Sequence, residues 1–407
     1  MTGTRTAGPL LRAPFVWFLG ARAVSWFGST MAPVAVTFAV LDLTPSAGLL
    51  AAVVAGRTGA FCAFVLFGGV VGDRLPRRLV LQTAHLAAAA TQGTAAALLL
   101  TGRATVAALV VLEILNGAVS AFTVPALQGI VPQLVPPESM QRATALLALS
   151  RNVLQVLGPS FGAVVVVVAG AGWALAVDAA SFLLAAALLI RIPVPGGERS
   201  GTPGSLVGDL RAGWAEFVGR RWLWVLVSAF ALLNAVYGGA WNVIAPIVAT
   251  SSVGRQGWGL MLSCFSGGTV VAAFVMARLA VRRILVAGVL TIASIGVLLV
   301  LVGMAAPLAV LLVASVIGGG GLGVFSIAWE TSLAQHVPPG ALSRVSATDT
   351  FFSFLAMPLG QLGIGLLAVT TEPRVLLVGC GLLYSLGAIM TLAVSDVRRL
   401  TTAVPGR

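Results

Sequence analysis

The sequence predicts an all-α membrane protein in which twelve transmembrane helices form two pseudo-symmetric six-helix bundles. Three observations lead to this fold class. Hydrophobic residues make up 58% of the 407 residues and charged residues only 9%, whereas about a quarter of the residues in a soluble domain are charged. The chain also contains a series of long apolar segments, and two loop motifs recur about half a chain apart.

The apolar segments are long enough to cross a bilayer, which requires about 20 mainly apolar residues each. In chain order the predicted spans are 14–40, 46–71, 79–101, 104–125, 143–169, 171–191, 222–248, 256–277, 283–304, 307–331, 345–369 and 374–395. An even number of spans places both termini on the same side of the membrane.

The arginines define which side that is. Most of them fall in the loops on the side of the termini, and the opposite loops hold only Arg103, Arg255 and Arg374. The positive-inside rule therefore places both termini in the cytoplasm of a multi-pass cell-membrane protein. The net charge of +12 follows from this distribution, so we expect the lipid bilayer, and no nucleic acid, as the partner of these charges.

The longest loop divides the chain into an N-terminal bundle (1–192), a linker (193–221) and a C-terminal bundle with a short tail (222–407). The linker begins at Pro193 and continues through Gly196 and Gly197, residues typical of a loop. From Leu206 to Arg220 it becomes amphipathic, which favours a helix on the cytoplasmic membrane surface over a disordered linker.

The two bundles are predicted to be copies of one six-helix unit. Val135-Pro136-Pro137 recurs as Val337-Pro338-Pro339, at an offset of 202 residues, and Arg77-Arg78 recurs as Arg282-Arg283, at an offset of 205 residues. Transporters are often built from such repeats, with the substrate bound near the midplane between them.

A charged stretch from Gly68 to Leu81 connects the second and third spans. We expect a loop of a few residues, with Asp73 and three arginines that can form or release a charge pair as the helices move. The alternative is an ordinary positive cytoplasmic loop. The stretch resembles motif A of the major facilitator superfamily, G-x-L-a-D-R-x-G-R-R/K-x-x-L, at positions Gly69, Asp73, Arg74, Arg77, Arg78 and Leu81. Val71 and Pro76 depart from that pattern. The resemblance implies a conformational latch on the cytoplasmic side.

The fifth span carries Gly158-Pro159-Ser160-Phe161-Gly162. A proline in mid-helix removes a hydrogen bond and bends the axis, and glycines let a neighbouring helix approach. The segment is similar to the core of the antiporter motif of the same superfamily, although Ala163 replaces its final glycine; a routine kink is the alternative. Further segments around Val124-Pro125 and Leu146–Asn152 resemble the enterobactin-exporter-like and macrolide-efflux-like subgroup.

Three spans each carry a polar stripe at helical spacing, which predicts a shared wet cavity. Glu113 is the only carboxylate near the centre of a span. The stripes are Arg22, Ser25 and Ser29; Glu113, Asn116 and Ser120; and Asn234, Tyr237 and Trp241. The resemblance implies the same, because the first, fourth, seventh and tenth spans line the cavity in this superfamily.

Ionisable groups inside a membrane are functional candidates. Glu113 is interpreted as a proton carrier or cation site with Arg22 or Arg57 as its partner, or else as one half of a static ion pair. Asp178 is expected to form a structural pair, with Arg57 as the candidate partner. The cysteines and histidines lack ligand spacing, so no metal and no cofactor are expected.

Together these features predict a monomeric transporter that exports a small hydrophobic compound (drug, natural product or siderophore) in exchange for protons. An importer or uniporter of the same fold and a transport-inactive sensor or accessory protein remain as alternatives. A membrane enzyme would need a catalytic cluster at the membrane edge, and the sequence offers none.

Overall fold

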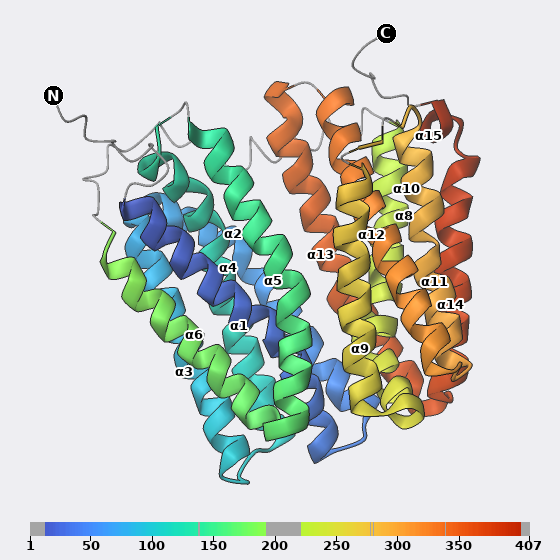
Figure 1. The fold of residues 1–407 in the computed structure, drawn as a ribbon, viewed down its shortest axis with the longest axis horizontal. Coiled ribbons are helices and arrows are strands. Elements are labelled where there is room, and N and C mark those ends of the chain that lie inside the picture. The colour runs from blue at the N-terminus through green and yellow to red at the C-terminus, as the bar shows by residue number, and fades with distance from the viewer. Residues whose placement is uncertain are drawn as a thin grey trace, which may run out of the picture. The chain divides into compact units, whose positions relative to one another are not determined.

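The computed structural model describes residues 13–136, 139–192, 221–276, 278–279, 281–337 and 339–399. These residues are almost entirely helical, and no strand occurs among them (Figure 1). The predicted amphipathic helix of the linker lies outside the described residues, as do the second proline of the first Val-Pro-Pro motif and the first proline of the second.

Six helices follow one another before the linker. They are α1 (Ala13–Leu43), α2 (Ala47–Arg74), α3 (Arg77–Leu100), α4 (Val106–Leu134), α5 (Met140–Ala169) and α6 (Ala171–Ile190). Thr105 caps α4, because its hydroxyl oxygen accepts the backbone N–H of Ala108 at 3.2 Å. Gly170 separates α5 from α6 at a φ of 93°, a conformation that glycine adopts at little cost.

The second series begins after the linker. It comprises α8 (Arg221–Gly239), the π-helix η3 (Ala240–Ile244), α9 (Ala245–Met276), α10 (Ile284–Ile292), α11 (Ser294–Gly303), α12 (Leu308–His336), α13 (Pro339–Thr370), α14 (Pro373–Met390), η4 (Thr391–Ala393) and α15 (Ser395–Arg399). Gly254, with φ 75° and ψ 173°, breaks α9 near its start and divides the seventh predicted span from the eighth. Helices α10 and α11 together form the ninth.

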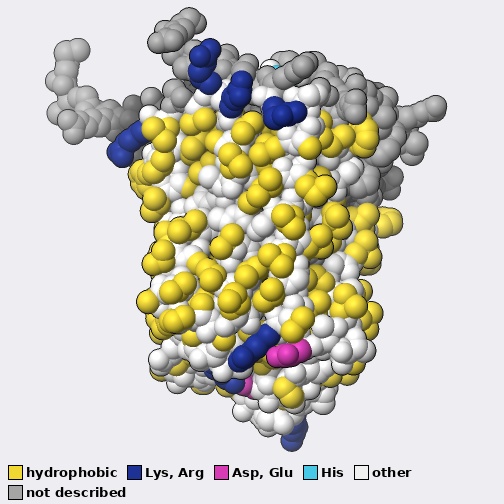
Figure 2. Space-filling model, turned by 90° about the vertical axis from the view of Figure 1, so that its right-hand side faces the viewer, with side chains coloured by type: hydrophobic (Ala, Val, Ile, Leu, Met, Phe, Trp, Pro, Cys, Tyr) yellow, Lys and Arg dark blue, Asp and Glu magenta, His cyan; other side chains and the backbone are white. Residues whose placement is uncertain are grey.

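Nine segments in the described part of the chain are long and apolar enough to cross a membrane. One of them, Leu223–Met276, contains two spans because of the break at Gly254. Helices α3 and α13, which both exceed 20 residues, complete the predicted all-α fold of twelve transmembrane helices. Figure 2 shows the corresponding surface: hydrophobic side chains cover the middle of this face, and charged side chains lie towards its two ends.

The helices group into two compact units. The first contains residues Met1–Thr44 and Gly56–Arg199, and the second contains Pro45–Ala55 and Ser200–Arg407. In the first unit, α6 packs on both α1 and α3, and α1 also packs on α5. In the second unit, α12 packs on α9 and α10, α13 packs on α8, and α11 packs on α14.

Corresponding helix pairs in the two units meet through glycines. Gly158 and Gly162 of α5 face Thr30 and Met31 of α1. A Cβ atom at Gly158 would collide with Thr30, and one at Gly162 would lie 3.2 Å from Met31, a tight contact. In the second unit, Gly360 of α13 lies against the backbone of α8 in the same way. Each glycine helix also contains a proline. The first and fifth spans therefore meet through glycines, as do the seventh and eleventh spans, which is expected of a duplicated bundle.

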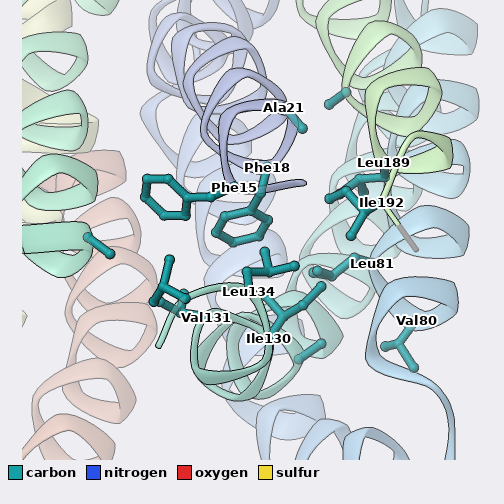
Figure 3. Close-up of a cluster of buried hydrophobic side chains, with 14 residues drawn as sticks. Phe15, Phe18, Ala21, Val80, Leu81, Ile130, Val131, Leu134, Leu189 and Ile192 are labelled. Atoms are coloured by element: carbon teal, nitrogen blue, oxygen red, sulfur yellow. The ribbon is translucent and has the colours of Figure 1, made fainter. Parts of the chain in front are cut away.

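A cluster of buried apolar side chains lies in the first unit near the start of α3. It includes Phe15 and Phe18 of α1, Leu81 of α3, Ile130 of α4 and Leu189 of α6 (Figure 3). Lipid tails are as apolar as these side chains, so close packing stabilises such a cluster more than removal from water does. The cluster packs the ends of α1, α3, α4, α5 and α6 against one another.

Candidate functional site

The connection between α2 and α3 is shorter than the predicted spans allow. Helix α2 continues through Arg74 and α3 begins at Arg77, so only Leu75 and Pro76 separate them. The glycine-rich stretch stays helical because a backbone in or near a bilayer must satisfy its own hydrogen bonds. The side chains of Asp73 and Arg74, and the surroundings of Gly69, lie outside the described residues.

Arg78 has a defined partner. Its Nη1 atom donates a hydrogen bond of 2.6 Å to the backbone oxygen of Ile192, just beyond the end of α6. A cation at a helix C-terminus interacts favourably with the exposed carbonyl groups there. This motif residue therefore joins the start of α3 to the end of α6.

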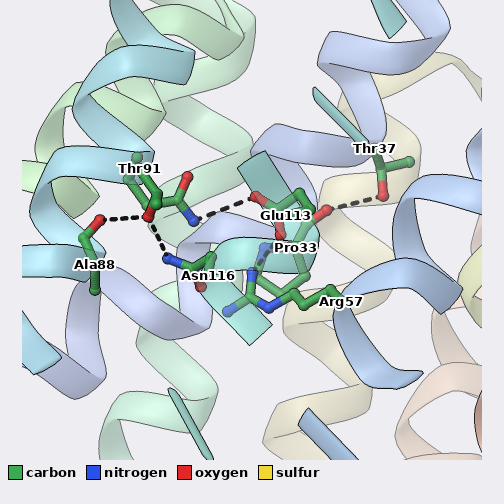
Figure 4. A network of polar contacts seen from close by, with 8 residues as sticks. Pro33, Thr37, Arg57, Ala88, Thr91, Glu113 and Asn116 are labelled. Atoms are coloured by element: carbon green, nitrogen blue, oxygen red, sulfur yellow. Dashed lines mark hydrogen bonds and ion pairs between the residues drawn. The ribbon is translucent and has the colours of Figure 1, made fainter. Parts of the chain in front are cut away.

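The central polar feature of the first unit is the carboxylate of Glu113 in α4, which is 2% exposed. Its Oε2 lies 3.1 Å from Nη1 of Arg57 in α2. Its Oε1 accepts a hydrogen bond of 3.3 Å from the Nε2 of Gln92 in α3 (Figure 4). Of the two arginines considered as partners, Arg57 is the one that binds Glu113. Three helices thus converge on one carboxylate.

The close crossing of α2 and α4 brings this ion pair together. Gly117, one turn after Glu113, lies so close to the carbonyl oxygen of Arg57 that a Cβ atom there would collide with it. Gly56 packs against Ile114 in the same crossing. The side chain of Arg57 is 25% exposed, whereas that of Glu113 is 3% exposed. The Arg57 side chain therefore contacts the buried carboxylate of Glu113 and is itself partly exposed.

The other polar residues of the first unit bond mainly to nearby groups. Asn116 is fully buried and donates to Thr91 of α3 at 3.1 Å. Ser25 and Ser29 donate to backbone oxygens of α1 itself, at 3.2 and 2.8 Å, and Ser120 is half-buried. Among the described contacts of these four predicted cavity residues, the side-chain bond from Asn116 to α3 is the one that joins two helices.

Arg22 and Asp178 occupy different settings from those predicted. The guanidinium carbon of Arg22 lies 3.9 Å from the ring centroid of Trp26, a cation–π contact within α1. Asp178 forms no close ion pair with Arg57, its candidate partner from the sequence; the guanidinium of Arg57 binds Glu113, and its charge acts on Asp178 only at longer range. Asp178 is fully buried, and among the described residues neither of its carboxylate oxygens has a hydrogen-bond partner. It packs against Gly28 of α1.

The second unit contains a cavity of about 220 Å³. Its lining comes from α8 and α10 to α14 and consists of Phe230, Asn234, Tyr237, Ile292, Ile295, Leu322, Phe325, Ser326, Trp329, Asp349, Ser353 and Tyr384. Two of the three residues predicted on the seventh span, Asn234 and Tyr237, are in this lining.

Trp241, the third residue of that stripe, is not in the lining. It is buried and packs on Trp258 and Phe265 of α9, with centroid distances of 5.0 and 5.1 Å. Trp241 belongs to the π-helix η3, whose wider turn shifts side chains away from the positions expected from α-helical spacing. Its ring still stacks with Tyr237 at 6.2 Å.

Gln92 and most of the residues that line the cavity were not predicted from the sequence. Gln92 lies seven residues after His85, and both are buried, so helical spacing on α3 was a usable signal. The chain has only two tyrosines, and both line the cavity. Asp349 was not predicted as a site residue. No group of three or more potential metal ligands occurs among the described residues.

Several solved structures share this fold at low sequence identity. A nucleoside transporter, NupG, matches with a TM-score of 0.70 and 14% identity over 93% of this chain and 98% of that one. An inward-facing bacterial homologue of the iron transporter ferroportin matches with a TM-score of 0.71 and 17% identity, over 94% of this chain and 99% of that one. A D-xylose-proton symporter matches with a TM-score of 0.66 and 15% identity, over 92% of this chain and 96% of that one. No match was found among curated protein sequences.

The family comparison extends over almost the whole sequence. A family model described as transmembrane secretion effector matches residues 4–403. The helices, their duplication and the transporter folds above agree with that match. The chain therefore belongs to the transmembrane secretion effector family and is a multi-pass transporter of the major facilitator superfamily.

Proposed function

We propose that this protein exports a small hydrophobic compound, such as a drug, a natural product or a siderophore, in exchange for protons. The observation that carries the proposal is the buried Glu113 carboxylate, bound by Arg57 and Gln92 where α2, α3 and α4 meet. A carboxylate inside a membrane is costly and marks a proton or ion pathway more often than a fold requirement. The enterobactin-exporter-like and macrolide-efflux-like resemblance supports the direction of transport.

A proton that binds Glu113 would weaken its attraction to Arg57, because a neutral carboxyl group no longer forms an ion pair. Arg57 would then be free to move toward its more accessible side. Since Gly117 holds α2 and α4 in close contact at this point, a change in the pair acts directly on the crossing of the two helices. Arg22, the other arginine predicted for proton coupling, would act at a distance by its charge.

Helix α2 connects this pair to the cytoplasmic motif. Arg57 and Asp73 lie 16 residues apart on one helix, about 24 Å at 1.5 Å per residue. Movement of α2 would therefore reach the latch residues Gly69, Asp73, Arg74, Arg77 and Arg78 and hold or release the cytoplasmic side during alternating access. The glycine–proline kink at Gly158, Pro159 and Gly162, packed on α1, supports the antiporter interpretation.

The substrate would contact polar and aromatic side chains. The cavity residue Tyr237 and its neighbour Asn234 offer stacking and hydrogen bonds. Ser25, Asn116, Ser120 and Trp241 complete the set predicted from the sequence.

The test is transport by inverted membrane vesicles against a panel of hydrophobic drugs and siderophores, with and without a pH gradient. The wild type should accumulate a substrate only when the vesicle lumen is acidic. Glu113→Gln should lose this dependence on the gradient. The matched control is Glu372→Gln, which removes a carboxylate from an exposed position at the start of α14 and should behave as the wild type.

Two results would contradict the proposal. Efflux by Glu113→Gln that still collapses with the pH gradient would place the proton site elsewhere. Uptake of the substrate in the opposite direction would identify an importer or uniporter of the same fold.

A further inference from the structure

The cavity of the second unit has an aromatic wall. Phe230 and Phe325 lie with their ring centroids 4.3 Å apart. Trp329 stacks on Phe325 at 6.4 Å, with the two rings inclined by 12°. Tyr237 and Tyr384 lie 6.5 Å apart in the same lining. Aromatic faces carry partial negative charge and attract cations within about 6 Å.

One carboxylate lies in this wall. Asp349 accepts a hydrogen bond of 2.9 Å from the Nε1–H of Trp329, and the Ser353 hydroxyl also donates to it. These donors are neutral. Within the described ranges, no arginine or histidine forms an ion pair with Asp349. A carboxylate in a site of low dielectric attracts a nearby cation far more strongly than it would in water.

We propose that this cavity binds a small aromatic cation, or the cationic aromatic end of a larger compound. The positive charge lies beside Asp349, and the ring lies among Phe325, Tyr237 and Trp329. This inference rests on the proposed function, because it names the class of compound that the exporter carries. The Trp329 hydrogen bond holds both the carboxylate and the indole ring in place for such a ligand.

The size of the cavity limits the ligand. Its volume of about 220 Å³ is below the roughly 300–1,000 Å³ of pockets that enclose a drug-sized molecule. A single ring with a quaternary ammonium group suits this space. An anion of the same size is disfavoured by both the carboxylate and the ring faces.

The experiment measures binding of radiolabelled phenyltrimethylammonium to the purified protein in nanodiscs by equilibrium dialysis, with empty nanodiscs subtracted. Two unlabelled competitors separate the contributions. Tert-butylbenzene has the same shape without the charge, and tetramethylammonium has the charge without the ring. The unlabelled cation should compete best, and each of the others should compete at least about tenfold more weakly.

Variants test the residues. Asp349→Asn keeps the side-chain shape and should weaken binding of the cation about tenfold or more. Glu330→Gln is the matched control, since Glu330 is an exposed carboxylate next to Trp329 and does not line the cavity; its binding should equal that of the wild type. Phe325→Leu should weaken binding severalfold, and it replaces Asp349→Asn as the decisive variant if the latter fails to fold.

Binding of the cation by a well-folded Asp349→Asn variant at wild-type affinity would overturn the inference, as would equal competition by tert-butylbenzene. The dialysis uses no gradient, so it separates this inference from the proposed function. If the protein binds the cation but shows no proton-driven export, the proposed function is contradicted and the cation site is supported. If it exports neutral compounds but does not bind the cation, the cation site is contradicted and the proposed function is supported.

Discussion

Substitution of Gly117 by alanine tests whether the crossing of α2 and α4 maintains the Arg57–Glu113 ion pair. The added Cβ atom would meet the carbonyl oxygen of Arg57, a backbone atom that no rotamer change can move aside. Ordinary contact requires at least 3.4 Å, so the two helices must separate by on the order of 1 Å, as overpacking of a close contact demands. This separation would strain the 3.1 Å ion pair between Arg57 and Glu113.

The energy of this substitution has two opposing parts. Overpacking costs about 1–3 kcal/mol, and alanine in place of glycine stabilises a helix interior by about 1 kcal/mol. We therefore expect a net loss of up to about 2 kcal/mol in stability. The control is Gly93→Ala in α3, where the added Cβ would find Ala179 at an ordinary 3.8 Å. That variant keeps the helix-propensity gain without the collision.

The assays are thermal unfolding of the purified protein and gradient-driven transport in vesicles. Gly117→Ala should unfold at a lower temperature than Gly93→Ala and should transport more slowly, with a loss of pH dependence resembling that of Glu113→Gln. If Gly117→Ala is as stable as Gly93→Ala and transports at the wild-type rate, the close contact of α2 and α4 at Gly117 does not maintain the ion pair.

Three further substitutions address the motif and the buried groups. Asp73→Asn should abolish transport and leave substrate binding largely intact, measured as binding and transport on the same preparation; normal transport would exclude a latch. Asp178→Asn should leave thermal stability unchanged or raise it by about 1 kcal/mol, because an unpaired buried carboxylate is costly; a clear loss would reveal a partner for that carboxylate. Gly158→Val should destabilise by about 1–3 kcal/mol through collision with Thr30, and thermal unfolding no lower than that of the wild type would contradict the close packing of α1 on α5.

The sequence was sufficient to predict the fold because the bilayer restricts the choices. Long apolar segments must be helices when water is absent, and the loop repeats indicated the duplication. Helix ends were harder to predict. The charged residues from Asp73 to Arg78 suggested a longer loop, but backbone hydrogen bonding extends α2 to Arg74.

Partners of buried charges could not be predicted from the sequence. Glu113 was a candidate from its position alone, yet its choice of Arg57 over Arg22 depends on how closely α2 approaches α4 at Gly117. Asp178 faces Gly28 of α1, a contact between residues 150 positions apart in the chain. Trp241 does not line the cavity with Asn234 and Tyr237 because it lies in a five-residue π-helix. A prediction based on 3.6 residues per turn does not account for the wider turn of a π-helix.

The two-residue connection between α2 and α3 also has a mechanical meaning. Leu75 and Pro76 can span at most about 7 Å when fully extended, so the connection allows little change in the distance between the end of α2 and the start of α3. A displacement of α2 along its axis would therefore move the start of α3 as well, because the two connecting residues cannot absorb it. Through the hydrogen bond from Arg78, such a motion would reach Ile192, the last described residue before the segment that joins the two halves of the chain. In the proposed mechanism the charged motif would therefore act on the start of the linker as well as on the helices.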